Sequence, residues 1–155
     1  MGAVAPVAPE RAGLRLPLGI GSFAITIIGL AAAVYLTVEH YAASTVLACP
    51  EGSVINCAKV TSSSYSMIGP APVALLGAIY FVAMALLCSP QAWRMRRLDA
   101  LRIAGAVAGV ASALWFVWVE LFRLDAICLW CTVVHLATLA LLGAVLWSTT
   151  GVRAR

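Results

Sequence analysis

Four long runs of apolar residues, separated by shorter polar or charged stretches, dominate the pattern along the chain. The runs cover residues 18–38, 68–88, 103–119 and 126–147. Each run is close to the roughly 20 residues that a helix needs to cross about 30 Å of hydrocarbon. None contains Asp, Glu, Lys or Arg, and none alternates apolar with polar residues as a membrane β-strand does. Because lipid does not tolerate an open sheet edge, the pattern predicts an all-α membrane protein with four transmembrane helices.

The stretches between the runs set the expected organisation. Residues 1–16 contain Pro6 and Pro9 and are expected to form an irregular arm, with residues 151–155 as a tail. The body, residues 17–150, is expected to be one membrane domain. Its one long connection, residues 39–67, is predicted to carry a short interfacial helix near residues 60–65. The other connections are short, which favours an antiparallel four-helix bundle, and Gly105 and Gly109 predict close helix contact.

Composition and charge give the chain an orientation. Hydrophobic residues make up 63% of its 155 residues and charged residues only 10%, too few for a soluble globule of this size. Most basic residues fall on one side of the predicted membrane: Arg11, Arg15, Arg94, Arg96, Arg97, Arg102, Arg153 and Arg155. The positive-inside rule therefore places both termini in the cytoplasm and the long loop on the extracytoplasmic side of an inner or plasma membrane. Topology explains the net charge of +4, so no nucleic-acid partner is expected.

One alternative concerns the first run, which could be a cleaved signal. The stretch "TVLACP" at residues 45–50 faintly resembles a lipoprotein cleavage site. However, the run is as long as a membrane span, and Glu39, His40 and Tyr41 interrupt it before the cysteine. The run is therefore expected to remain as a helix.

The five cysteines are sorted by this topology. Cys49 and Cys57 lie in the long loop, Cys128 and Cys131 at the outer end of the last run, and Cys88 alone at the inner end of the second. Two structural disulfides are one interpretation of the outer four. However, C-x-x-C is the spacing of exchange-active thiols, and the first turn of a helix stabilises a thiolate at Cys128. A zinc site is not expected, because C-x7-C is too long for a zinc knuckle, and Cys88 is expected to be a packing residue.

Among Asp, Glu, Lys, Arg and His, only His135 falls inside the four runs. It follows Cys128 and Cys131 at helical spacings of seven and four residues, so the three are expected to share a helix face. The histidine could hydrogen-bond to a neighbouring helix. Ionisable groups at this depth are costly and usually functional, so it could also donate to a carbonyl of an apolar electron acceptor such as a quinone. A membrane-soluble oxidant would explain why a dithiol is placed in a lipid-facing segment.

Four stretches together resemble the vitamin K epoxide reductase family, specifically its bacterial members that oxidise protein thiols. They are "CPEGSVINC", "AKVTSSSY", "PVALLGAIYF" and "CLWCTVVH", and the resemblance covers residues 18–147. It implies a four-helix bundle around a membrane quinone, menaquinone or ubiquinone, capped by the outer loop. Cys128 and Cys131 would be the active-site pair, with Cys131 facing the quinone. Cys49 and Cys57 would be the shuttle pair.

Two further residues carry over from the resemblance. His135 matches a ring-bearing position that helps to bind the quinone head group. Ser63 matches a polar residue near the quinone, and its alternative role is a helix cap. Val73 stands where the animal enzymes have an asparagine that contacts the substrate, which argues against vitamin K epoxide as the substrate. Which loop cysteine exchanges with Cys128 stays open from spacing, although the resemblance favours Cys57. The resting disulfides could be Cys49–Cys57 with Cys128–Cys131, or a Cys57–Cys128 bridge.

The resemblance implies a thiol oxidoreductase that reoxidises an extracytoplasmic thioredoxin-fold protein and supports disulfide bond formation. Many bacterial relatives carry a fused thioredoxin-like domain, whereas this sequence ends at Arg155, so the partner is expected to be separate. One alternative reverses the purpose and uses thiols to reduce a quinone or vitamin K epoxide. An alternative of another class is a structural four-helix membrane protein with inert disulfides.

Overall fold

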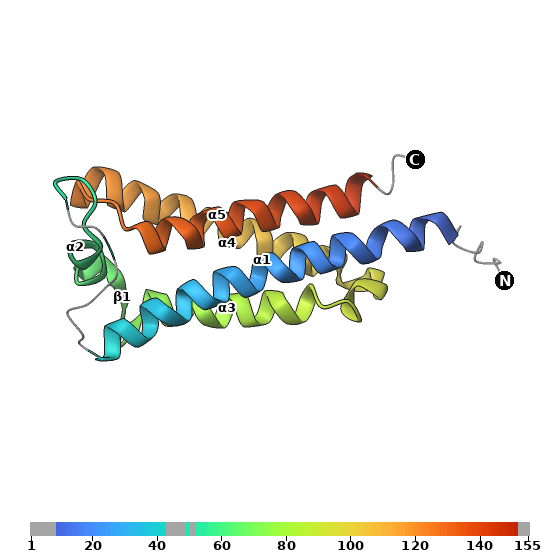
Figure 1. Cartoon of the computed structure of the whole chain (residues 1–155), viewed down its shortest axis with the longest axis horizontal. Coiled ribbons are helices and arrows are strands. Elements are labelled where there is room, and N and C mark those ends of the chain that lie inside the picture. Colours follow the sequence, from blue (N-terminus) through green and yellow to red (C-terminus); the bar gives the residue numbers. More distant parts are fainter. Residues whose placement is uncertain (1–8, 43–48, 50–51, 152–155) are drawn as a thin grey trace.

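Four long helices run side by side in the structure, a computed structural model that describes residues 9–42, 49 and 52–151 (Figure 1). They are α1 (Pro9–Ala42), α3 (Val73–Leu87), α4 (Asp99–Val119) and α5 (Leu129–Leu146). Helix α1 packs against both α3 and α5, and α4 packs against α5, while α3 and α4 touch each other less. Helix α1 begins and α5 ends at the same end of the bundle, opposite the short elements of the long loop (Figure 1). The predicted all-α bundle is therefore present.

Within the part of the chain that the structure describes, three segments are long and apolar enough to span a membrane: Gly19–Ala42, Arg96–Leu124 and Leu129–Thr149. The fourth, α3, is apolar but has only 15 residues, which gives a length of about 22 Å. The predicted second span, residues 68–88, was thus placed too early. Its first residues form a small hairpin in which β1 (Met67–Ile68) pairs with β2 (Ala71–Pro72), and Gly69 turns the chain at a φ of +61°. Pro72 then precedes the first turn of α3, where a missing N–H costs no helical hydrogen bond.

Helix α1 begins earlier than the apolar pattern predicts. It starts at Pro9, so residues 9–16, which were expected to belong to an irregular arm, are helical. Proline is tolerated at the first helical position, and the polar residues after it do not oppose a helix. The rest of the predicted arm, residues 1–8, lies outside the described residues, as do residues 152–155 of the predicted tail.

The long loop contains the predicted short helix, slightly shifted. Helix α2 (Cys57–Thr61) is followed by a 3₁₀ turn at Ser64–Ser66. Asn56 caps α2, because its side-chain oxygen accepts a hydrogen bond of 2.8 Å from the Lys59 N–H. These short elements cover one end of the bundle (Figure 1).

The glycines of α4 allow the neighbouring helices to approach closely, as predicted. A Cβ atom at Gly105 would lie 2.7 Å from the Sδ atom of Met84 on α3. One at Gly109 would collide with the Tyr80 hydroxyl and lie 2.7 Å from Cγ2 of Thr138 on α5. Glycine is required at both positions because the space of a side chain is already filled.

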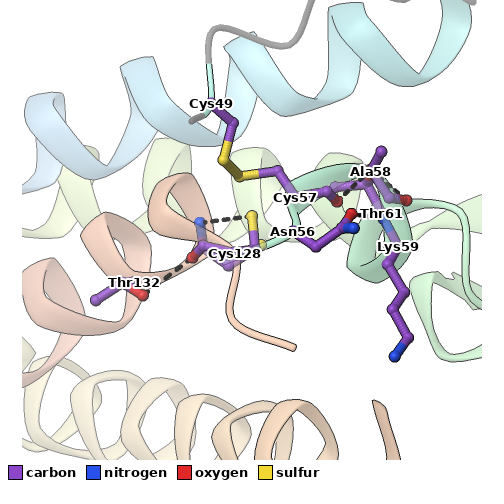
Figure 2. The surroundings of a disulfide bond; sticks show 9 residues. Cys49, Asn56, Cys57, Ala58, Lys59, Thr61, Cys128 and Thr132 are labelled. Carbon is purple, nitrogen blue, oxygen red and sulfur yellow. Dashed lines mark hydrogen bonds between the residues drawn. A yellow bond between two sulfur atoms is a disulfide. The ribbon is translucent and has the colours of Figure 1, made fainter. Parts of the chain in front are cut away.

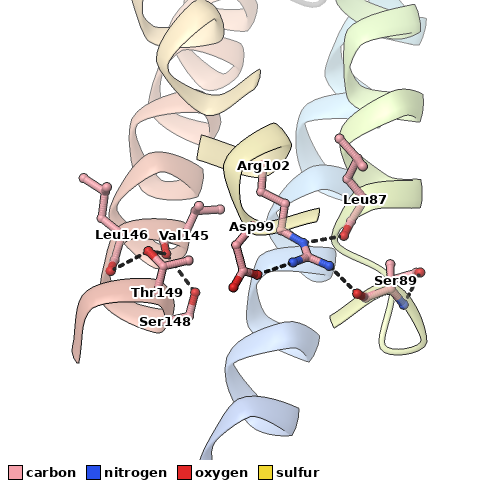
Figure 3. Close-up of polar contacts among 9 residues, drawn as sticks. Leu87, Ser89, Asp99, Arg102, Val145, Leu146, Ser148 and Thr149 are labelled. Atoms are coloured by element: carbon pink, nitrogen blue, oxygen red, sulfur yellow. Dashed lines mark hydrogen bonds and ion pairs between the residues drawn. The ribbon is translucent and has the colours of Figure 1, made fainter. Parts of the chain in front are cut away.

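A buried arginine joins α3 to α4 at the end of the bundle away from the loop (Figure 3). Arg102 has an exposed fraction of 0%. Its Nη1 donates to the Asp99 carboxylate at 2.6 Å, its Nε donates to the Leu87 carbonyl at 2.7 Å, and its Nη2 donates to the Ala92 carbonyl. The guanidinium carbon also lies 4.4 Å from the centroid of the Trp93 ring. The charge pattern treated Arg102 as one of several inner basic residues, but its contacts give it a packing role as well.

We expect replacement of Arg102 by Met to lower the free energy of unfolding by about 3–5 kcal/mol, because it leaves Asp99 as a buried charge without this partner. Thermal unfolding of the purified protein in detergent measures the loss. Arg97→Met is the matched control, since Arg97 is exposed in the same connection and its change should cost no more than about 0.5 kcal/mol. Equal losses in the two variants would contradict a structural role for the Arg102 cluster.

Candidate active site

Cys128 directly precedes the first residue of α5. It is the N-cap, its exposed fraction is 0%, and its Sγ accepts a hydrogen bond of 3.3 Å from the Cys131 N–H (Figure 2). The pKa of Cys128 is lowered from its ordinary value, chiefly because the Cys131 thiol hydrogen-bonds to it, with the backbone N–H of Cys131 adding to the effect against the opposing effect of burial. The predicted favouring of the thiolate at Cys128 therefore has a local cause.

The loop cysteines form a disulfide, Cys49–Cys57, and Cys128 and Cys131 are free thiols (Figure 2). This arrangement departs from both resting patterns considered from the sequence, because it has the loop bridge without a Cys128–Cys131 bridge. It corresponds to a reduced C-x-x-C pair beneath an oxidised loop.

Backbone hydrogen bonds tie the loop to the start of α5. The Asn56 N–H donates to the Ile127 carbonyl at 3.1 Å, and the Ile127 N–H donates to the Val54 carbonyl at 2.9 Å. Ile55 and Ile127 thus form an isolated parallel β-bridge. Cys57 and Cys128 are the next cysteines along the two segments, and both are buried in one cluster with Leu36, Val60 and Ala126. The bridge therefore holds the loop disulfide beside the C-x-x-C pair.

A cavity of about 340 Å³ adjoins this cluster and is lined by the four long helices and the loop. Three of the six predicted catalytic and quinone-binding residues, Ser63, Cys131 and His135, line it. Cys49, Cys57 and Cys128 do not. The predicted common face therefore holds for Cys131 and His135 only, because Cys128 is a capping residue in extended conformation and not part of the helix. Most of the lining is apolar, and it includes Leu36, Val73, Phe81, Phe116 and Val134.

The two residues predicted to contact the quinone, His135 and Ser63, differ in their hydrogen bonds. The His135 ring, in a residue only 9% exposed, has no hydrogen bond to another described residue, so the expected alternative of a bond to a neighbouring helix is not found there. The Ser63 hydroxyl donates to the Val60 carbonyl at 2.8 Å. In this rotamer the Ser63 proton is already engaged, and its oxygen is left to accept a hydrogen bond.

Two further cavity residues, Glu120 and Tyr80, have polar groups suited to chemistry but were not singled out from the sequence. Glu120 is only 5% exposed and lines the cavity. Its carboxylate is hydrogen-bonded with the side chain of Cys131 and the backbone of Cys128. The Tyr80 hydroxyl is buried without a hydrogen-bond partner among the described residues. The apolar runs gave no signal for either residue, because Glu120 follows the third run directly and a tyrosine is unremarkable in a membrane helix.

Comparison with known families matches residues 21–146 to the vitamin K epoxide reductase family. This chain belongs to that family. No individual curated protein matches the sequence. Vitamin K epoxide reductase family members are membrane oxidoreductases that use a quinone as redox partner. The matched residues include the cysteines of the loop and of the C-x-x-C pair and all of the residues that line the cavity.

The cavity of this vitamin K epoxide reductase family protein fits a quinone head group. Its walls are largely apolar, as the flat ring and isoprenoid chain of a quinone require. A quinone carries two carbonyl acceptors, and the buried Tyr80 hydroxyl supplies a donor that no described residue engages. The Cys131 thiol lines the same cavity. Among the described residues, no group of three or more His, Cys, Asp or Glu side chains is arranged to hold a metal ion.

Proposed function

We propose that the protein oxidises the thiols of a separate extracytoplasmic thioredoxin-fold protein and passes the electrons to membrane menaquinone or ubiquinone. The observation that carries the proposal is the position of the C-x-x-C pair. Cys131 lines the quinone-sized cavity, while Cys128 is buried beside the loop disulfide. One dithiol therefore contacts both the membrane-side site and the loop. The activity would support disulfide bond formation outside the cytoplasm.

The first half of the cycle is thiol–disulfide exchange. A thiolate of the reduced partner attacks the Cys49–Cys57 disulfide, and the second partner thiol resolves the mixed disulfide, which leaves an oxidised partner and two loop thiols. Cys57 then attacks Cys128 of the oxidised Cys128–Cys131 pair, and Cys49 resolves that bridge. Burial of Cys57 and Cys128 in one cluster supports Cys57 as the exchanging residue. The lowered pKa of Cys128 makes it a good leaving group when Cys49 attacks Cys57 and releases Cys128 from the Cys57–Cys128 bridge.

The second half of the cycle is oxidation of the Cys128–Cys131 dithiol. Two S–H bonds break and one S–S bond forms, and the quinone takes up two electrons and two protons to become a quinol. His135 is proposed to donate to one quinone carbonyl, and Ser63 to accept a hydrogen bond from the quinol hydroxyl. Tyr80 supplies a further donor from α3.

The proposed topology has four membrane-crossing helices with both termini in the cytoplasm. The membrane domain is residues 17–150, and its extracytoplasmic loop, residues 39–67, carries the shuttle cysteines. Exposed basic residues at the end of the bundle opposite the loop disulfide and the C-x-x-C pair support this orientation. They are Arg94, Arg96 and Arg97. The active site would then face the extracytoplasmic side of the inner or plasma membrane.

The function is tested by mixing the purified protein in lipid nanodiscs with a reduced thioredoxin-fold protein and a quinone, without oxygen. We expect one quinol for each disulfide formed in the partner. Quinol formation that needs only a small thiol, and is not accelerated by the protein dithiol, would favour a quinone reductase instead. No quinol with either reductant would leave the structural alternative.

We expect His135→Phe to raise the KM for quinone about tenfold while leaving thiol exchange with the partner unchanged. Loss of one hydrogen bond to the quinone carbonyl costs roughly 1.4 kcal/mol, which is a factor of ten. Steady-state rates over a range of quinone concentrations give the KM. Leu136→Phe is the control, because Leu136 is adjacent on α5 and 59% exposed away from the cavity. An unchanged KM in His135→Phe would remove His135 from the quinone site.

A further inference from the structure

Glu120 continues the buried face of α4, seven residues after Ala113, and begins an unusual turn of the backbone. Glu120–Leu124 is a π-helical turn at the end of α4, and the Ala126 N–H donates to the Glu120 carbonyl at 3.1 Å. Asp125, with a left-handed φ of 46°, ends the turn. Leu121, Phe122 and Arg123 of the turn are exposed, whereas Glu120 is buried. Such π-turns are rare and frequently occur at functional sites.

The Glu120 carboxylate touches the group that must lose a proton. It is hydrogen-bonded with the Cys131 side chain, and Cys131 also hydrogen-bonds to the Cys128 sulfur. The single proton of the Cys131 thiol therefore has two alternative acceptors beside it, the Cys128 sulfur and the Glu120 carboxylate. Because Glu120 also lines the cavity, the same carboxylate borders the volume assigned to the quinone.

Stability does not explain a carboxylate at this position. No described Lys or Arg forms an ion pair with Glu120. An uncompensated charge taken out of water costs several kcal/mol, and ionisable groups within membrane segments are usually retained for function. A glutamine would make similar neutral hydrogen bonds at lower cost. The carboxylate therefore points to a proton-transfer role.

We propose that Glu120 is a catalytic proton carrier that takes the proton of the Cys131 thiol and delivers it to the bound quinone. The inference rests on the proposed function and adds the path of one proton. Cys131 becomes a thiolate as Glu120 becomes a carboxylic acid. The Cys128–Cys131 bond then forms, two electrons reduce the quinone, and Glu120 returns its proton to one quinol oxygen. The proton of Cys128 supplies the other quinol oxygen, so Glu120 ends the cycle as it began.

The location of the site makes such a carrier necessary. The cavity walls are mostly apolar, which gives few routes for bulk water to accept the proton. A thiolate transfers electrons and a thiol does not, so the step needs a positioned base. General acid–base groups of this kind contribute about 10²–10⁴-fold to a rate.

The decisive experiment is a single turnover with Glu120→Gln, in which the dithiol form is mixed with quinone under anaerobic conditions and quinol formation is followed. We expect a rate about 100-fold below wild type. Glu120→Asp keeps a carboxylate and is expected to recover part of this loss. Exchange between the partner and the loop disulfide should stay within about twofold, since it does not use Glu120. Asp125→Asn is the control, because it removes an exposed charge from the same segment and asparagine tolerates the left-handed backbone.

A second readout is independent of quinone reduction. Oxidising the dithiol with diamide should change the carboxyl bands of the infrared difference spectrum, and the change should be absent in Glu120→Gln. If wild type gives this spectral change but no quinol, the proposed function fails while the link between Glu120 and Cys131 holds. A single-turnover rate for Glu120→Gln within twofold of wild type overturns the proton-carrier role. So does an equal slowing in Glu120→Gln and Glu120→Asp with a lowered melting temperature.

Discussion

The Cys131→Ala protein is expected to lose quinone reduction by about 10³-fold or more with any thiol donor, since removal of a reacting nucleophile typically has an effect of this size. Cys131 is the one cysteine of the four outer cysteines that lines the cavity, so no other thiol is placed to pass electrons to the quinone. Anaerobic quinol formation measures the loss. Cys88→Ala is the control, because Cys88 is buried at the opposite end of the bundle in a separate cluster. Activity of Cys131→Ala within tenfold of wild type would contradict the assigned order of the cysteines.

The same variant should trap the internal exchange step. Without Cys131, the Cys128 thiolate has the loop disulfide beside it as its remaining target. Attack on Cys57 forms a Cys57–Cys128 bridge and releases Cys49 as a thiol, so the number of disulfides is unchanged. Peptide mapping under non-reducing conditions identifies the bridge, and a Cys128→Ala/Cys131→Ala double variant should show only Cys49–Cys57. A Cys49–Cys128 bridge would reverse the assigned roles of the loop cysteines.

Removal of the loop disulfide should slow quinone reduction by a protein reductant far more than quinone reduction by a small thiol. We expect Cys49→Ala/Cys57→Ala to lower quinone reduction driven by the thioredoxin-fold partner about 100-fold or more, while the rate with dithiothreitol falls far less. Cys128 is 0% exposed, so a folded protein has no direct access to it, whereas a small dithiol needs only a local opening of the loop. Rates with the two reductants, measured on one preparation, give the ratio.

The control for this pair is Ser53→Ala, an exposed loop position with no part in the exchange. Equal loss with both reductants would mean that the loop pair is structural. Full activity with the protein substrate would mean that the partner reaches Cys128 directly. Only a loss selective for the protein substrate supports the two-pair relay.

The membrane bundle was predictable from sequence because apolar length is a local property. Four runs without charged residues were sufficient to indicate it, and the C-x-x-C and C-x7-C spacings with His135 indicated the redox site. The start of α3 was misplaced because Ile68, Ala71 and Pro72 are apolar whether they form a hairpin or a helix. Hydropathy alone does not separate these two structures.

The remaining differences have separate causes. Glu120 points inward because it continues the buried face of α4, seven residues after Ala113, but it was missed because the apolar run ends directly before it. Cys128 does not share a helix face with His135, because it caps α5 and is not part of the helix. The closeness of Cys57 and Cys128 depends on a β-bridge between residues 72 positions apart, Ile55 and Ile127, which no local pattern encodes.

In the proposed cycle, that β-bridge would also determine how the two halves are coupled. Because it fastens the loop disulfide to the start of α5, the exchange between Cys57 and Cys128 takes place at a high effective concentration and pays little entropy of encounter. Collision with the soluble partner is then the slower event at low partner levels. At low partner concentration, the turnover rate should rise in direct proportion to that concentration. The Cys128–Cys131 pair should remain oxidised between collisions.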